Sequence, residues 1–180
     1  YMADAMTRHR LLFEPPKRYR LQYTLRKAFD WLRSVRVLDA DEFGAVGTEA
    51  ARVLLDILRH RHVLQSVSGS DVHLGFAGGE AMRQVAVALA EQLLEPVDDL
   101  PDTLTFHALV SGFDVGDPTT DPNAFFSCFT SVPPVQVERR FVGLHAPPVV
   151  EPGELARLQQ LGDIREAYES AGDLDVTMTS

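Results

Sequence analysis

The hydrophobic positions of this 180-residue chain follow two different spacings, and the two meet near its centre. Val72, Leu74 and Phe76 occupy every second position, which is typical of a strand with one buried face. A helical stripe follows directly, and it consists of Met82, Val85, Ala86, Leu89 and Leu93. The pattern therefore predicts a buried strand, a short turn and a helix between residues 71 and 94.

The turn between that strand and that helix is rich in glycine. Gly75, Gly78 and Gly79 can adopt positive φ angles or let another backbone approach closely. A strand that enters a helix through such a turn directs free backbone N–H groups and the positive helix end at one spot, which favours an anion. Many α/β folds use the same turn only to change direction, so a purely structural role stays open.

Strands and helices continue to alternate along the rest of the chain. Further strands are predicted at 34–38, 104–111, 139–144 and 173–179. Further helices are predicted at 21–32, 43–62, 121–129, 151–161 and 163–171, with Asp39–Glu42, Asp121 and Asp163 as caps. For the helix at 43–62, the expected core face is Phe43, Val46, Ala50, Val53, Leu54 and Ile57. The alternation predicts a three-layer α/β domain with a mostly parallel sheet and helices on both faces.

We expect two parts along the chain. Residues 1–19 look like a basic N-terminal arm, in which Pro15 and Pro16 stop any early helix. Residues 20–180 form one α/β ligand-binding domain.

The net charge of −9 is unevenly distributed. Residues 1–36 hold nine basic and three acidic side chains, a charge of +6, which leaves −15 for the remainder. A basic start could contact nucleic acid or an acidic partner, but it could equally be a solvated helix face or pack on the acidic body. Cys128 is the only cysteine, which excludes an intrachain disulfide and fits a reducing compartment. No apolar stretch reaches membrane-spanning length, so we expect a cytoplasmic protein without membrane contact.

Polar and glycine residues gather where the predicted strands end. In parallel sheets, ligands bind at the carboxyl ends of the strands, near a change in strand order. The candidate ligand-binding residues are Gly75, Ala77, Gly78, Gly79, Glu80, Ala81, Met82, Ser111, Gly112, Asp114, Asp121, Asn123, His145 and Thr177. The sequence has no metal-ligand spacing and no cofactor motif, so we expect neither a metal nor a cofactor.

The order of these elements resembles the effector-binding domain of SorC-type sugar-binding transcriptional regulators, which is itself similar to the sugar-phosphate isomerase and CoA-transferase superfamily. The stretches that carry the resemblance are 19–38, 75–82, 104–111 with 121–123, 141–150 and 164–177. The resemblance implies a Rossmann-like, sugar-phosphate isomerase-like fold. It also implies a small-molecule effector held by the glycine-rich turn and a homo-oligomeric protein.

Three departures from that family bear on fold and function. The sequence ends at Ser180, where the family continues through further strands, so we expect a domain that is incomplete at its carboxyl end. Its sheet is then abbreviated, completed by a partner, or continued beyond this residue. Glu80 and Ala81 stand where the family's phosphate loop offers hydroxyl or basic side chains. A carboxylate beside a phosphate is unfavourable unless it faces away or binds a sugar hydroxyl, so a neutral polyol or a nucleoside remains open. This chain contains no recognisable DNA-binding module, and nucleic acid would be reached only through a module outside it.

Three hypotheses follow. The first is a non-catalytic sensor that binds a sugar, a sugar phosphate or a nucleotide-like compound and controls an oligomer or an attached output module. The second is an isomerase or hydrolase in which Asp114, Asp117, Asp121 or Glu80 acts as base and His107 or His145 carries protons. Against it, the Asp residues also suit turns and caps, and mid-strand His107 suits a hydrogen-bonded core. The third is an interaction module with a vestigial pocket.

Overall fold

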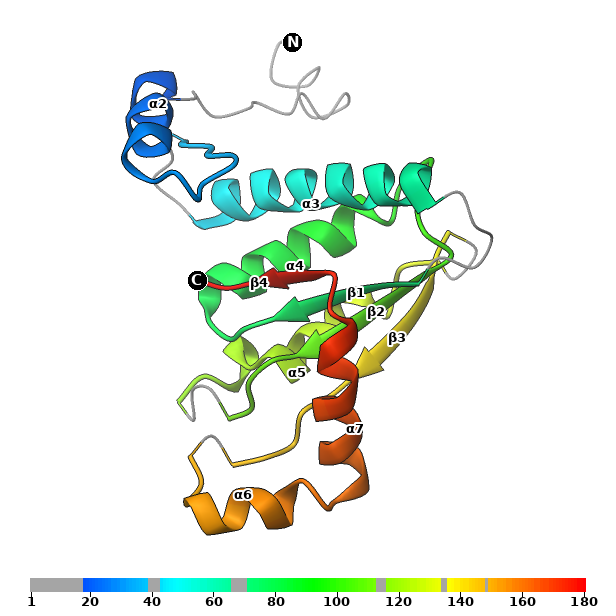
Figure 1. Cartoon of the computed structure of the whole chain (residues 1–180). Helices are drawn as coiled ribbons and strands as arrows, with labels where there is room; N and C mark the ends of the chain where they lie inside the picture. The colour runs from blue at the N-terminus through cyan, green and yellow to red at the C-terminus, as the bar shows by residue number, and fades with distance from the viewer. Residues whose placement is uncertain (1–17, 39–42, 66–70, 113–115, 134–135, 148) are drawn as a thin grey trace.

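The computed structural model describes residues 18–38, 43–65, 71–112, 116–133, 136–147 and 149–180 (Figure 1). The predicted N-terminal arm lies outside these residues except at its end, where Tyr19 is the first residue of a helix. The predicted cap over 39–42 also lies outside the described residues.

Four strands form one parallel sheet. They are β1 (Asp71–Phe76), β2 (Thr103–Ala108), β3 (Glu138–Val142) and β4 (Val176–Met178), in the order β3-β2-β1-β4. The four strands predicted at these places are confirmed, and with them the mostly parallel α/β sheet. The strand predicted at 34–38 is wrong. Within the described residues this segment forms only a single bridge, at Leu38, because a groove lies between it and β4 and no described strand pairs with it.

Two described α-helices precede β1, and the others lie between the strands. They are α2 (Tyr19–Ala28), α3 (Phe43–Gln65), α4 (Glu80–Gln92), α5 (Pro122–Phe125), α6 (Pro152–Leu158) and α7 (Gly162–Ser170). Three short 3-10 helices lie at Pro118–Thr120, Phe126–Phe129 and Ala171–Asp173. Asp121 caps α5 as predicted, since its carboxylate accepts the Asn123 N–H. The predicted cap Asp163 is wrong: Leu161 precedes α7, and Asp163 lies in the first turn, where its charge complements the helix dipole.

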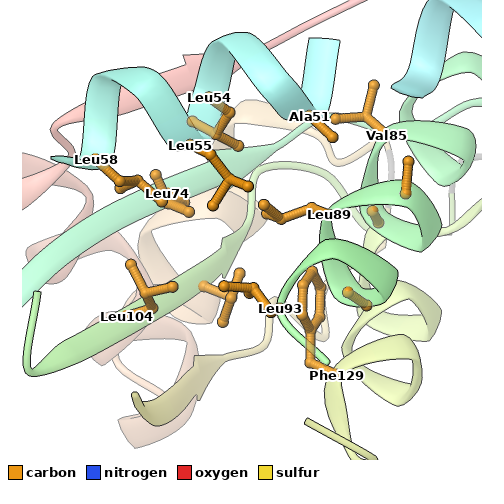
Figure 2. Close-up of a cluster of buried hydrophobic side chains, with 14 of the residues drawn as sticks. Ala51, Leu54, Leu55, Leu58, Leu74, Val85, Leu89, Leu93, Leu104 and Phe129 are labelled. Atoms are coloured by element: carbon orange, nitrogen blue, oxygen red, sulfur yellow. The ribbon is translucent and has the colours of Figure 1, made fainter. Parts of the chain in front are cut away.

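One face of the sheet is apolar, and we call it the apolar face. It carries Val72, Leu74, Phe76, Leu104, Phe106 and Ala108, all buried. Side chains from α3, α4 and Phe129 pack on it (Figure 2). The stripe predicted on α4, from Met82 to Leu93, is buried as expected. The main core of the domain lies between this face and the two helices.

The predicted core face of α3 is confirmed only in part. Leu54 is buried and Ala50 packs against the core, whereas Val46 and Ile57 are 46% and 37% exposed, and the side chain of Phe43 lies outside the described residues. The described apolar side chains that α3 buries are Ala51, Leu54, Leu55 and Leu58. The reason is a close approach of two helices, because a Cβ on Gly47 would lie 2.8 Å from the backbone carbonyl carbon of Gln84. That contact turns the side of α3 that carries Gly47 and Ala51 toward α4.

The opposite face of the sheet is polar, and we call it the polar face. It carries Asp71, His73, Gly75, Thr103, Thr105 and His107. Helix α7 covers its carboxyl end, where Ala167 and Tyr168 line a cavity of about 120 Å³ together with His107. Helices therefore lie on both faces of the sheet, and the molecule has three layers as predicted (Figure 1).

Candidate functional site

The strand order changes direction at β1. The chain continues from β1 to β2 and β3 on one side, and β4 returns to pair with β1 on the other side. The connection that leaves β1 runs along the apolar face as α4, whereas α7 reaches β4 from over the polar face (Figure 1). In open parallel sheets this arrangement leaves a crevice at the carboxyl end of the strand where the order changes. The glycine-rich turn at 77–79 lies at that point.

The turn is tied to the end of β4 and to the loop that follows β2. Gly79, with a φ of 114°, donates its N–H to the carbonyl oxygen of Thr120 at 2.9 Å. Ala77 donates its N–H to the Met178 carbonyl at 3.0 Å. A ligand at the turn would share the Gly79 N–H with Thr120, and it would meet the first N–H groups of α4, which have no partner within the helix. Thr120 is a buried 3-10 residue that the sequence pattern did not single out.

The negative charge of Glu80 is balanced by side chains of its own helix. Its carboxylate accepts hydrogen bonds from Arg83 Nε at 2.7 Å, from Arg83 Nη2 at 2.8 Å and from Gln84 Nε2 at 2.6 Å. These hydrogen bonds lower the pKa of Glu80 to about 2, and the bond from Arg83 has the largest effect. The carboxylate is therefore ionised and compensated along the first turn of α4. The unfavourable charge expected beside an anion is reduced accordingly.

Asp121 and Asn123 join the ends of β2 and β3. Asp121 Oδ2 accepts the N–H of Gly112 at 2.6 Å, and Asp121 Oδ1 accepts the N–H of Asn123 at 2.8 Å. The Asn123 side chain donates to the carbonyl of Leu144 and accepts its N–H, both at 3.0 Å. These polar atoms are engaged with backbone groups, so the two side chains fix the rim of the crevice.

The remaining predicted residues lie around the same edge of the sheet. Ser111 follows β2 and is partly buried, and His145 follows β3 and is exposed. Thr177 lies in β4 and is also exposed. Asp114 lies outside the described residues. The described candidates thus lie around the carboxyl ends of the strands. Gly79, Asp121 and Asn123 among them already form hydrogen bonds with other parts of the chain.

A groove runs beside the open edge of β4. It measures about 520 Å³, and its lining includes the predicted residues Met82 and Thr177. Most of the wall is apolar and comes from Val46, Ala50, Val53, Leu54, Ile57, Val85, Val176 and Met178. Its polar corner is Glu49, which binds Arg36 at 2.6 Å and Arg52 at 2.9 Å. The sequence analysis assigned the apolar residues of α3 to the core and did not predict the groove.

A pair of histidines lies on the polar face. His73 Nδ1 is 2.8 Å from His107 Nε2, and His73 Nε2 is 3.4 Å from Asp71 Oδ2. His107 is 2% exposed, and burial is the main cause that lowers its pKa. The prediction that His107 is a hydrogen-bonded core residue is confirmed. The sequence analysis did not predict its partner, His73. Both residues lie on the polar face, and His73 is paired in register with Thr105, two residues before His107.

Other chemistry in the described residues is sparse. No three side chains of His, Cys, Asp or Glu gather there as a metal site would require. No helix among them is long and apolar enough to cross a membrane. Cys128 packs against the core, and burial raises the pKa of its thiol, which suits an apolar residue better than a nucleophile.

Known proteins resemble this chain only in structure. No protein-family model matches it, and neither does any curated protein. The full-length sorbitol operon regulator SorC from Klebsiella pneumoniae matches with a TM-score of 0.64 and 17% identity, over 88% of this chain and 47% of the regulator. The fold is that of SorC-type regulators. The resemblance predicted from the sequence is therefore confirmed at the level of the fold.

Two further regulators match this SorC-like fold. The probable sor operon regulator from Shigella flexneri has a TM-score of 0.59 and 17% identity, over 88% of this chain and 58% of its own. A DeoR family transcriptional regulator from Listeria monocytogenes has a TM-score of 0.57 and 20% identity, over 88% of this chain and 56% of its own. The present chain thus spans about half the length of the regulators that it matches.

Proposed function

We propose that this SorC-like domain is a non-catalytic sensor of a small polar metabolite. The ligand is a sugar, a sugar phosphate or a nucleotide-like compound, and it binds over the turn at 77–82. The observation that supports the proposal is the position of this turn at the end of β1, where the strand order changes direction, together with the ion pair by which Arg83 balances the charge of Glu80. With that charge compensated, the first N–H groups of α4 can face an anionic or hydroxyl group.

Sensing is favoured over catalysis by the hydrogen bonds of the candidate acids and bases. A catalytic base needs a carboxylate that is free to reach a substrate proton. Both oxygens of Asp121 accept backbone N–H groups instead, and Glu80 binds Arg83 and Gln84. These bonds suit a rim that transmits the presence of a ligand to the ends of β2 and β3.

The proposed output is a shift between two states of an oligomer or of an attached module. A ligand shifts such an equilibrium only by its difference in affinity for the two states. Contact with DNA would come through a module outside this chain, in keeping with its fold relatives, which are described as transcriptional regulators.

Thermal unfolding in the presence of sugars, sugar phosphates and nucleotides tests the proposal. A ligand that binds only the folded chain stabilises it by about 2.7 kcal/mol at a hundredfold excess over Kd, which raises the melting temperature. Arg83→Met should reduce the response to anionic ligands, because Glu80 then loses its compensating charge. Arg59→Met, on the exposed face of α3 at the other end of the sheet, is the matched control.

Gly79→Val gives a second test at the turn. The φ of 114° at Gly79 strains any larger residue, so its fold is checked first by circular dichroism. A panel that produces no shift with the wild-type chain overturns the proposal. A shift of equal size in Arg83→Met and Gly79→Val would place the binding site elsewhere and overturn it as well.

A further inference from the structure

Helix α3 carries two apolar stripes. The first is buried against the sheet and α4, and it consists of Ala51, Leu54, Leu55 and Leu58. The second recurs at helical spacing along the groove beside β4, and it consists of Val46, Ala50, Val53 and Ile57. None of the four residues of the second stripe is fully buried. This stripe faces a concave space rather than flat surface, which is typical of a small-molecule site.

The groove is continuous with the glycine-rich turn. Met82, two residues after the first residue of α4, lines the groove. Thr177 and Met178 line it from β4, and the carbonyl of Met178 accepts the N–H of Ala77 in the turn at 3.0 Å. In Figure 1, the carboxyl end of β4 and the beginnings of α3 and α4 lie at the same end of the molecule. A molecule bound over the turn therefore has an apolar space directly beside it.

The size and lining of the groove indicate what kind of group it accepts. Its volume of about 520 Å³ lies within the range of about 300–1,000 Å³ that is usual for small-molecule sites. None of the described residues that line it is aromatic, so a flat ring would find no stacking partner there. Valine, isoleucine and leucine side chains prevail, and two flexible methionines can adapt to a hydrocarbon chain. The acid in the lining, Glu49, is paired with Arg36 and Arg52, so its charge is compensated. The groove therefore suits a saturated hydrocarbon group.

We propose that the effector of this domain is amphipathic, with a polar head over the turn at 77–82 and a saturated alkyl or acyl substituent in the groove beside β4. The inference rests on the proposed function for the head and specifies the class of ligand. A sugar or a phosphate alone would leave the second stripe of α3 in water, whereas the substituent covers it. Burial of hydrocarbon then adds affinity, because the hydrogen bonds of the head largely replace hydrogen bonds to water.

Isothermal titration calorimetry with two homologous series tests the inference. The probes are n-alkyl glucosides and n-alkyl phosphates from methyl to octyl, each used below its micelle concentration. Every added methylene should tighten binding by roughly three- to fourfold until the groove is filled. The heat-capacity change of binding should become more negative along each series, because more apolar surface leaves water.

Variants separate the groove from the turn. Val46→Glu and Ile57→Glu each place a carboxylate in the groove at a partly exposed position, so they should abolish the gain with chain length and leave the affinity for the methyl compounds unchanged. Leu94→Glu is the matched control, because Leu94 is 47% exposed against 46% for Val46 and lies just past the other end of α4. It should keep the full gain. Arg83→Met should weaken all alkyl phosphates by a similar factor and keep the gain per methylene.

Several results would overturn the inference. Equal affinity along both series would do so, and binding of the methyl compounds would then leave the proposed sensor standing. A gain with chain length that persists in both groove variants, once circular dichroism has confirmed their folding, would place the hydrocarbon elsewhere. Equal affinity for n-hexanol and hexyl glucoside would show that the groove acts without the turn. A wild-type chain that shows no gain but self-associates in sedimentation equilibrium, with loss of that association in Val46→Glu, would assign the groove to a second copy. Failure of every compound to bind would contradict the proposed function together with the inference.

Discussion

The two faces of the sheet are built on different principles. On the apolar face, Phe106 lies among Phe76, Phe129 and Phe141, with ring centroids 4.2–6.2 Å away. On the polar face, the neighbouring Thr105 donates its hydroxyl to Asp71 at 2.9 Å, and the imidazoles of a histidine pair meet nearby. Parallel sheets covered on both sides usually carry apolar residues on both faces. Here the strands alternate instead.

This difference separates two roles. Burial of aromatic and aliphatic surface on the apolar face supplies most of the free energy of folding. Hydrogen bonds on the polar face contribute less each, because they replace hydrogen bonds to water. They do, however, place titratable groups beneath α7 and beside β4, where His73 and Asp175 exchange backbone and side-chain bonds. Stability and pH response therefore belong to opposite sides of the same strands.

The largest expected effect comes from a pair of adjacent substitutions on β2. Phe106→Ala should lower the free energy of unfolding by about 3–5 kcal/mol, because it removes a fully buried ring and leaves a cavity. Thr105→Val, one residue away on the polar face, should cost only about 1 kcal/mol through the lost bond to Asp71. Urea unfolding measures both. Equal losses would contradict the separation of roles.

The close contact of α3 with α4 gives the next largest effect. Gly47→Ala should destabilise by about 1–3 kcal/mol, because its Cβ would lie 2.8–2.9 Å from backbone atoms of Gln84 and the helices must move apart. Gly44→Ala, one turn earlier, meets only Gln84 Oε1 at 3.9 Å and should be neutral or stabilising by less than about 1 kcal/mol. Thermal unfolding of the two variants distinguishes a packing effect from helix propensity. Similar melting temperatures would argue against a tight contact.

The sequence predicted the centre of this fold well and its margins poorly. Strand β1, the turn and α4 combine alternation, glycine and a helical stripe in consecutive residues, so local pattern and tertiary packing agree there. On α3, Val53 and Leu54 are both apolar, and only the approach of α4 at Gly47 decides which of them is buried. Residues 34–38 alternate like a strand, but pairing depends on a neighbouring strand that is absent beside them in the described chain.

The candidate site shows a similar limit. Its position follows from the rule that parallel strands bring their carboxyl ends together. The partners of its side chains do not follow from that rule. The bonds from Arg83 to Glu80 and from Asn123 to Leu144 depend on rotamers and on contacts across 3 to 21 residues. The sequence therefore located the edge of the sheet and left the state of its polar groups undetermined.

Acidification should affect the polar face first, and by less than the two core substitutions. Burial lowers the pKa of His107 from 6.5, the neighbouring His73 lowers it further, and Asp173 and Asp71 oppose the shift. Below pH 6.5 the unfolded chain therefore binds a proton that the folded chain does not, and stability falls as the pH falls. Urea midpoints measured across this range should fall less steeply in His107→Gln. His60→Gln, on the exposed face of α3, should keep the wild-type slope, and an unchanged slope in His107→Gln would contradict the assignment.

The smallest effect is expected at the outer margin of the polar face. Arg140 lies 3.7 Å from Asp71 and 3.2 Å from Glu138, but its side chain is 59% exposed. Exposed ion pairs of this kind contribute about 0–1 kcal/mol and are screened by salt. Arg140→Met should therefore shift the urea midpoint only slightly, and about 1 M salt should remove the difference. A loss as large as that of Gly47→Ala would mean that charge pairing on the polar face carries stability after all, and the contrast between the two faces would not hold.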